Sequence, residues 1–240
     1  MGIAETSLRW LKHQRWPLAL MALCIGLFWA EPTLDLITSR WFFDGNGFPW
    51  DTNTVVQLIY RVFAKIHLAF LVALPVLAVR EHLRRGSDPR AIPRRMRYAF
   101  LWLTLLIGPG VITHVGLKDN SFGRPRPRDV SEFLGEKPYA APFEISQACP
   151  KNCSFVSGHA AIGFWFLTLG WVYGRRRWMV AGFTVGLVVG ATRLIQGAHF
   201  LSDVVFAFWV VWFTNALLAP WFDLPSNALL ASDRSTDRPA

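Results

Sequence analysis

Long apolar runs separated by short polar segments form the pattern of this 240-residue chain. A helix of about 20 apolar residues is long enough to cross the hydrocarbon core of a bilayer. Six runs approach that length: 16–30, 62–79, 98–117, 159–174, 178–194 and 200–221. The pattern therefore predicts an all-α polytopic membrane bundle with six transmembrane helices.

The runs follow one another closely, which favours a single integral-membrane domain over residues 1–231. Residues 232–240 are polar, and we expect them to form a disordered tail. The first run could instead be a secretory signal peptide, because basic residues precede it. No small-residue cleavage site follows it, however, and Glu31 and Pro32 stand there instead. We therefore expect a retained helix.

Composition agrees with a membrane location. The chain is 52% hydrophobic and contains 12 Trp and 19 Phe, which is too apolar for a soluble domain of this length. Its formal net charge is +9, but the basic residues gather in short segments between the apolar runs. No basic helix or aromatic platform typical of nucleic-acid binding is present. We expect the partners to be the bilayer and a membrane lipid, with no nucleic acid.

The distribution of Lys and Arg predicts the orientation. Segment 80–97 contains seven arginines and segment 175–177 contains three, whereas segment 31–54 contains four acidic residues and one arginine. The positive-inside rule places the arginine-rich segments and both termini in the cytoplasm. Segments 31–54, 118–158 and 195–200 then lie on the outer side.

Fixed cations lie at the outer ends of the predicted helices. Lys118, Arg124 and Arg126 belong to the start of the long outer segment, and Arg193 lies near the end of the fifth run. Hydrolysis of a phosphate ester requires positive charge on the phosphate oxygens, and the planar guanidinium suits them. Two prolines stiffen the segment around the arginines. The alternative is that these arginines only bind lipid headgroups at the interface.

Ser157, Gly158 and His159 stand at the start of the fourth run. Free N–H groups at a helix N-terminus bind anions, and Gly158 allows a close approach of the backbone. Ser157 would cap the helix and donate to phosphate, and His159 could protonate a leaving oxygen. A plain serine cap followed by an interfacial histidine is the alternative.

His199 and Asp203 are four residues apart and therefore share one face of a helix. A carboxylate on one imidazole nitrogen leaves the other nitrogen as a nucleophile. Asp203 lies in an apolar run, where an ionisable group is costly without a partner. The alternative is that the pair only holds helices together.

His159, His199 and Asp203 could also form a metal site, but the converging cations would repel a divalent ion. We therefore expect metal-free chemistry and no cofactor. Basic residues also stand at the start of the second run, and two interpretations remain for them. They either extend to the membrane interface or contact a second anionic group of the substrate. These residues are Arg61, Lys65 and His67.

Cys149 and Cys153 lie four residues apart in a polar outer loop. We expect a disulfide between them if the loop faces an oxidising compartment. A zinc pair is the rival, but no matching Cys/His pair lies nearby.

Together the three motif segments resemble the type 2 phosphatidic acid phosphatase superfamily, which also includes the vanadium haloperoxidases. The family pattern is Lys-x6-Arg-Pro, then Pro-Ser-Gly-His, then Ser-Arg-x5-His-x3-Asp. The third motif matches in spacing with Thr192 in place of Ser, and the second has Val156 in place of Pro. In the first motif, seven residues separate Lys118 from Arg126 and five separate it from Arg124. We favour Arg126 for the family role.

The resemblance covers roughly residues 98–215 and implies a phosphohistidine mechanism without a metal. It implies that His199 attacks phosphorus, that Asp203 orients His199 and that His159 is the acid. The residues implied to hold the phosphate are Lys118, Arg126, Ser157, Gly158 and Arg193.

The stretch 149–159, together with Glu132 and Phe133, looks similar to bacterial lipid A phosphatases of the inner membrane. This narrower resemblance implies a site at the periplasmic face and lipid A as the substrate. Undecaprenyl-pyrophosphate or phosphatidylglycerophosphate phosphatases are alternatives, as is a lipid phosphotransferase. A non-catalytic lipid-binding or transport protein is a further alternative, against which the complete His159, His199 and Asp203 set argues. The sequence makes no prediction of the oligomeric state.

Overall fold

The computed structural model describes residues 3–84, 91–119 and 122–225, and this part of the chain is helical. The described residues form no β-strand, and only one isolated bridge joins Val130 to Lys137. The all-α class predicted from the apolar runs is therefore confirmed. The predicted tail 232–240 lies outside the described residues, as do Arg85 and Arg90 of the basic segment.

Eight α-helices and shorter helical segments follow one another in the described chain. The α-helices are α1 (Ile3–Ala30), α2 (Leu34–Arg40), α3 (Thr54–Leu83), α4 (Ala91–Leu105), α5 (Gly158–Trp165), α6 (Thr168–Tyr173), α7 (Arg176–Ile195) and α8 (Leu201–Leu218). A π-helix, η2 (Leu106–Lys118), continues α4. The 3-10 segments are η1 (Pro49–Thr52), η3 (Pro127–Asp129), η4 (Ser131–Phe133) and η5 (Ala219–Phe222).

Four helical stretches are long and apolar enough to cross a membrane: Thr54–Leu83, Pro93–Lys118, Arg176–Ile195 and Leu201–Phe222. A fifth is reached if Trp10–Ala30 and Leu34–Arg40, which meet at 82°, count as one span. The predicted fourth span is instead divided into α5 and α6, each too short to cross alone. The count of six spans stays a prediction.

Close packing against α7 accompanies the division between α5 and α6. A Cβ on Gly182 would lie 2.3 Å from the backbone nitrogen of Leu167, and a Cβ on Gly186 would lie 2.0 Å from the Phe164 ring. The missing side chains thus let α7 approach these backbones, as small residues do between membrane helices. The end of α5 and the turn at Phe166 and Leu167 are therefore packed closely against α7.

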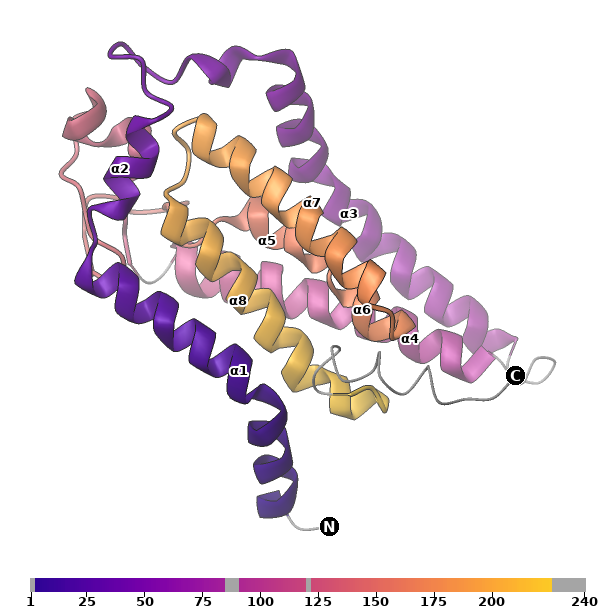
Figure 1. The fold of residues 1–240 in the computed structure, drawn as a ribbon. Coiled ribbons are helices and arrows are strands. Elements are labelled where there is room, and N and C mark those ends of the chain that lie inside the picture. Colours follow the sequence, from indigo (N-terminus) through magenta and orange to yellow (C-terminus); the bar gives the residue numbers. More distant parts are fainter. Residues whose placement is uncertain (1–2, 85–90, 120–121, 226–240) are drawn as a thin grey trace.

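Figure 1 shows α7 and α8 crossing the middle of the bundle, with α3 along one side and α1 along the other. The core between them is rich in aromatic rings, among them Phe100, Phe164 and Trp171. The start of α1 and the end of η5 lie at one end of the bundle (Figure 1). The start of α5, the start of α8 and the end of α7 lie toward the opposite end, where the loops after η2 also gather.

Candidate active site

Backbone hydrogen bonds join the three motif segments at this end of the bundle. The N–H of Ser157 donates to the carbonyl of Asp203 at 3.0 Å, which joins the second segment to the third. The N–H of Ser154 donates to the carbonyl of Arg124 at 2.8 Å, which joins the second to the first. One side-chain contact between the segments, from Arg124 to Asp203, joins residues 79 positions apart.

His199 is buried, and one of its ring nitrogens is committed to the protein. Nδ1 lies 2.9 Å from the carbonyl oxygen of Ser154. Because a carbonyl can only accept, Nδ1 carries the proton and Nε2 keeps its lone pair. Asp203 Oδ2 lies farther from Nδ1, at 3.4 Å. The carbonyl of Ser154 is therefore the nearer of two groups that orient the ring.

The surroundings of His199 keep its imidazole neutral. Burial lowers the pKa of His199 well below its usual value, and the charges of Lys118, Arg126 and Arg193 lower it further. A neutral imidazole at pH 7 is the state that a nucleophile requires. The same cations that would hold a phosphate therefore keep the attacking nitrogen unprotonated.

Asp203 accepts hydrogen bonds at both oxygens. Oδ2 accepts from the backbone N–H of Phe200 at 2.8 Å and from the hydroxyl of Ser154. Oδ1 accepts from Arg124 at 2.9 Å. The carboxylate is fully buried and holds the start of α8 against the loop that carries Ser154. Its position fixes both groups that contact Nδ1 of His199.

Arg124 is 1% exposed, and its guanidinium lies over the ring of Phe200. Five hydrogen bonds match the five N–H groups of the side chain. They run to the carbonyl of Ala140, the hydroxyls of Ser202 and Tyr139, and the carboxylates of Asp203 and Asp35. From the sequence, we expect Arg124 to be one of the phosphate-binding residues. This geometry leaves it no N–H group for a phosphate oxygen.

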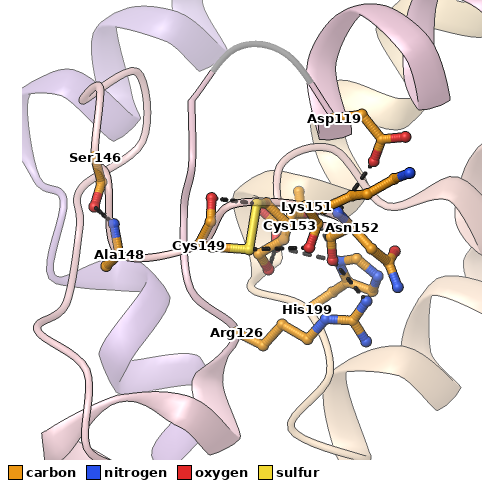
Figure 2. The surroundings of a disulfide bond; sticks show 11 residues. Asp119, Arg126, Ser146, Ala148, Cys149, Lys151, Asn152, Cys153 and His199 are labelled. Carbon is orange, nitrogen blue, oxygen red and sulfur yellow. Dashed lines mark hydrogen bonds and ion pairs between the residues drawn. A yellow bond between two sulfur atoms is a disulfide. The ribbon is translucent and has the colours of Figure 1, made fainter.

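Arg126 is only partly buried and points toward His199 (Figure 2). One of its nitrogens, Nη2, donates to the carbonyl of Asn152 at 3.0 Å. That single protein contact leaves further N–H groups of the fork for an anion. The sequence names both Arg124 and Arg126 and favours Arg126 for the family role, and Arg126 is the one of the two with N–H groups open to an anion in the described part of the chain.

Lys118 and Arg193 are the other two cations beside His199, and each is 4% exposed. The guanidinium of Arg193 lies 4.6 Å from the centre of the Tyr60 ring. Its Nη1 donates to the side chain of Gln196, while its buried Nε has no partner among the described residues. Lys118 ends the π-helix η2, which contains Pro109. π-helical turns are frequent at functional sites.

His159 stacks on the same aromatic residue, Tyr60. Its ring lies 4.9 Å from the ring of Tyr60, and its buried Nε2 has no partner in the described part of the chain. Ser157 caps α5 by accepting from the N–H of Ala160 at 3.4 Å. A Cβ on Gly158 would lie 2.9 Å from Nε2 of His114, so glycine suits this close approach. The start of α5, with Ser157 and His159, thus lies beside the start of α8.

Cys149 and Cys153 form a disulfide with their Cα atoms 5.7 Å apart (Figure 2). The loop that they close contains Asn152, whose carbonyl holds Arg126 and whose N–H donates to Asp119 at 3.0 Å. The described residues contain no group of three His, Cys, Asp or Glu side chains placed to bind a metal.

Sequence reasoning missed several residues of this site. Asp35 entered only as one of the acidic charges of the first outer segment, and Tyr60 was not considered. Neither has a motif, because each reaches the site through the packing of α2 or α3. Arg61 and Lys65 remain exposed on α3, and His67 is half-buried. No contact places these three with the phosphate-binding groups.

The comparisons with known proteins agree on one family. The model of the PAP2 superfamily matches residues 98–225. The lipid A 4'-phosphatase of Francisella tularensis subsp. novicida is 41% identical over 123 residues, which cover 50% of this chain and 55% of that protein. The lipid A 4'-phosphatase of Rhizobium leguminosarum is 32% identical over 197 residues, covering 75% and 84%. That of Rhizobium etli is 29% identical over 196 residues, covering 75% and 76%. No solved structure gives a significant match.

Proposed function

This chain belongs to the PAP2 superfamily and is a lipid phosphatase, and we propose that it removes a phosphate monoester from lipid A. The names of the three relatives support the substrate. One observation carries the chemistry: His199 has Nδ1 committed to the carbonyl of Ser154, which leaves a neutral Nε2 beside three cations.

The phosphate group binds between Lys118, Arg126 and Arg193. Their charges offset the two negative charges of a phosphate monoester. Among the described residues, Arg126 and Arg193 have N–H groups without a protein partner. The first N–H groups of α5, after Ser157, point their partial positive charge at the same region. These contacts strengthen as negative charge moves onto the phosphate oxygens in the transition state.

Nε2 of His199 attacks phosphorus while the bond from phosphorus to the lipid oxygen breaks. His159 gives its proton to that oxygen, so that the dephosphorylated lipid leaves as a neutral hydroxyl. A bound dianion favours the protonated form of His159 before this step. Water then attacks the phosphohistidine, His159 accepts the proton of the water, and inorganic phosphate leaves with His199 restored.

No metal is required in this scheme, because fixed cations perform the charge stabilisation that a divalent ion supplies elsewhere. The local positive charge of Lys118, Arg126 and Arg193 would also oppose the binding of such an ion at the nucleophile. The proposed reaction therefore proceeds in the presence of a chelator.

The site is proposed to face the periplasm from the inner membrane. Six spans result if α1, α3, α4 with η2, α5 with α6, α7 and α8 each cross once. The start of α1 and the end of η5 then share the cytoplasmic side, in agreement with their common end of the bundle in Figure 1. The phosphate of a lipid headgroup in the outer leaflet would reach the three cations directly.

Purified protein in detergent with EDTA tests the proposal. Lipid A, undecaprenyl pyrophosphate and phosphatidate are offered separately, and both the lipid products and the released phosphate are measured. Lipid A should lose one phosphate, vanadate should inhibit, and His199→Ala should be inactive. Turnover of only another lipid would replace the substrate, and wild-type activity retained by His199→Ala would overturn the mechanism.

A further inference from the structure

We propose that Asp35, on α2, is a positioning residue for His199 that acts through Arg124 and Asp203. The inference rests on the proposed function, because it assigns a role in orienting the proposed nucleophile. Asp35 lies outside residues 98–225, which match the family model. The first part of the chain would therefore supply a part of the active site.

Asp35 is fully buried and is held by donors alone. Oδ1 accepts from the backbone N–H of Ser202 at 2.8 Å, and Oδ2 accepts from Arg124 at 2.7 Å. The hydroxyl of Ser202 accepts from Arg124 and therefore donates its own proton to Oδ2 of Asp35. Three donors directed at two oxygens fit a carboxylate, which has no proton to offer.

Arg124 joins this carboxylate to the one beside His199. Its Nη2 donates to Asp35 and its Nη1 donates to Asp203, at 2.7 and 2.9 Å. A planar guanidinium holds its two ends at a fixed separation. The position of Asp35 therefore determines where Arg124 holds Asp203, and Asp203 in turn fixes Ser154 and lies 3.4 Å from Nδ1 of His199.

The net charge of the buried side chains behind His199 also depends on Asp35. Burial raises the pKa of Asp35, whereas the charge of Arg124 and the hydrogen bonds from Ser202 oppose that rise. With both carboxylates ionised, the buried set Asp35, Arg124 and Asp203 carries a net charge of −1. The imidazole becomes positively charged when Nε2 bonds to phosphorus while Nδ1 keeps its proton. A fixed negative charge behind Nδ1 stabilises that positive charge, and burial strengthens the effect. Without Asp35 the net charge of the set is zero.

The bend between α1 and α2 delivers Asp35 to this place. The two helices meet at 82°, and Figure 1 shows α2 beside the loops at the same end of the bundle as the start of α8. Ser202 lies in the first turn of α8, 167 positions from Asp35. The contact is therefore produced by the fold and has no signature in the local sequence.

The test compares Asp35→Asn with wild type in detergent, using lipid A as substrate. The amide keeps the volume and can still accept from Ser202, but it removes the charge that holds Arg124. We expect kcat to fall between about 10-fold and 100-fold, by analogy with the loss of hydrogen-bond partners behind metal-binding histidines. KM should stay within about twofold, because Lys118, Arg126 and Arg193 still hold the phosphate.

A pH profile separates positioning from a merely structural role. His199 also faces Lys118, Arg126, Arg193, His159 and Asp203, all of which the variant retains. Loss of one negative charge should move the acidic limb of kcat/KM to lower pH, since it disfavours protonated His199. The titration of the substrate is common to both proteins and cancels in the comparison. An unshifted limb, or an unchanged kcat in folded Asp35→Asn, would overturn the proposal.

Asp44→Asn is the matched control, because Asp44 is exposed in the same outer segment and caps only its own turn. It should behave as wild type. If Asp35→Asn does not fold, Ser202→Ala decides: it removes the hydroxyl shared by Asp35 and Arg124 and should lower kcat at least about threefold without a change in KM. An unchanged kcat in Ser202→Ala would reject the role of Asp35.

A readout that needs no activity distinguishes this inference from the proposed function. In 15N-histidine NMR, the pKa of His199 should be lower in the Asp35→Asn protein than in wild type. In the Ser202→Ala protein, the ring should lose part of its population protonated at Nδ1. Inactive wild-type protein that shows these shifts would refute lipid A hydrolysis but keep Asp35 as the positioning residue. Unchanged spectra would refute the positioning role itself.

Discussion

Arg124 and Arg126 lie two residues apart and have opposite surroundings. Arg124 is enclosed by five protein acceptors, whereas Arg126 donates to the single carbonyl of Asn152. Sequence spacing could not separate them, because the first motif has one residue more than the family pattern. Their contacts with carboxylates separate them: Asp35 and Asp203 bind Arg124, and we propose that Arg126 binds the substrate.

Substitution of Arg126 should therefore lower activity, whereas substitution of Arg124 should lower stability. Arg126→Ala removes charge-assisted hydrogen bonds of about 1.5–3 kcal/mol, so kcat/KM should fall about 10-fold to 100-fold with little change in the melting temperature. Arg124→Ala leaves two buried carboxylates without their cation and should destabilise the protein by about 3–5 kcal/mol.

Steady-state kinetics and thermal unfolding in one detergent measure both variants. Arg175→Ala, an exposed arginine at the other end of α7, is the control and should resemble wild type in both. A stable, active Arg124→Ala protein together with an unfolded Arg126→Ala protein would reverse the assignment.

At the scale of elements, apolar runs predicted where helices lie but not how they are interrupted. Runs 62–79 and 178–194 fall inside α3 and α7. Run 159–174 is divided by a turn at Phe166, where the chain packs closely against glycines of α7. Such tertiary packing cannot be read from the hydrophobic pattern of the run. The π-helical half of run 98–117 was likewise not predicted, since hydrophobicity does not distinguish an α-turn from a π-turn.

The disulfide loop should affect substrate binding, because it positions Arg126. The double variant Cys149→Ser and Cys153→Ser releases the loop that contains Asn152, whose carbonyl positions the guanidinium. We expect KM to rise about threefold to tenfold, which corresponds to one neutral hydrogen bond, while kcat changes less. Cys24→Ser, at a free cysteine in α1, is the control. Unchanged kinetics in the double variant would show that the loop does not position Arg126.

At the scale of the whole molecule, the distribution of Lys and Arg and the chemistry of the motifs predict the same outer face. The motif residues were predicted to meet there, and the structure does gather them at one end of the bundle. Asp35 shows what a linear reading misses, because its partners Arg124 and Ser202 lie 89 and 167 positions away. Motifs record residues that touch the phosphate, whereas the residues behind them are placed by packing.

Cysteine labelling in intact cells with a permeabilised outer membrane tests the orientation. In a Cys24→Ser background, Ser131→Cys in η4 should react with a membrane-impermeant maleimide, because we propose that its segment faces the periplasm. Arg176→Cys, at the start of α7, should react only after the inner membrane is opened. Both positions are exposed at opposite ends of the bundle. The reverse pattern would place the site in the cytoplasm.

Trapping the covalent intermediate tests the central claim most directly. Wild-type protein is mixed with lipid A labelled in its phosphate, quenched in alkali within one turnover and digested, and the peptides are sequenced by mass spectrometry. If Nε2 of His199 attacks phosphorus, labelled phosphate should be found on His199, bound through Nε2, and none should be found in the His199→Ala protein. Phosphate release within that turnover with no label on His199, or with the label on another side chain, would contradict it.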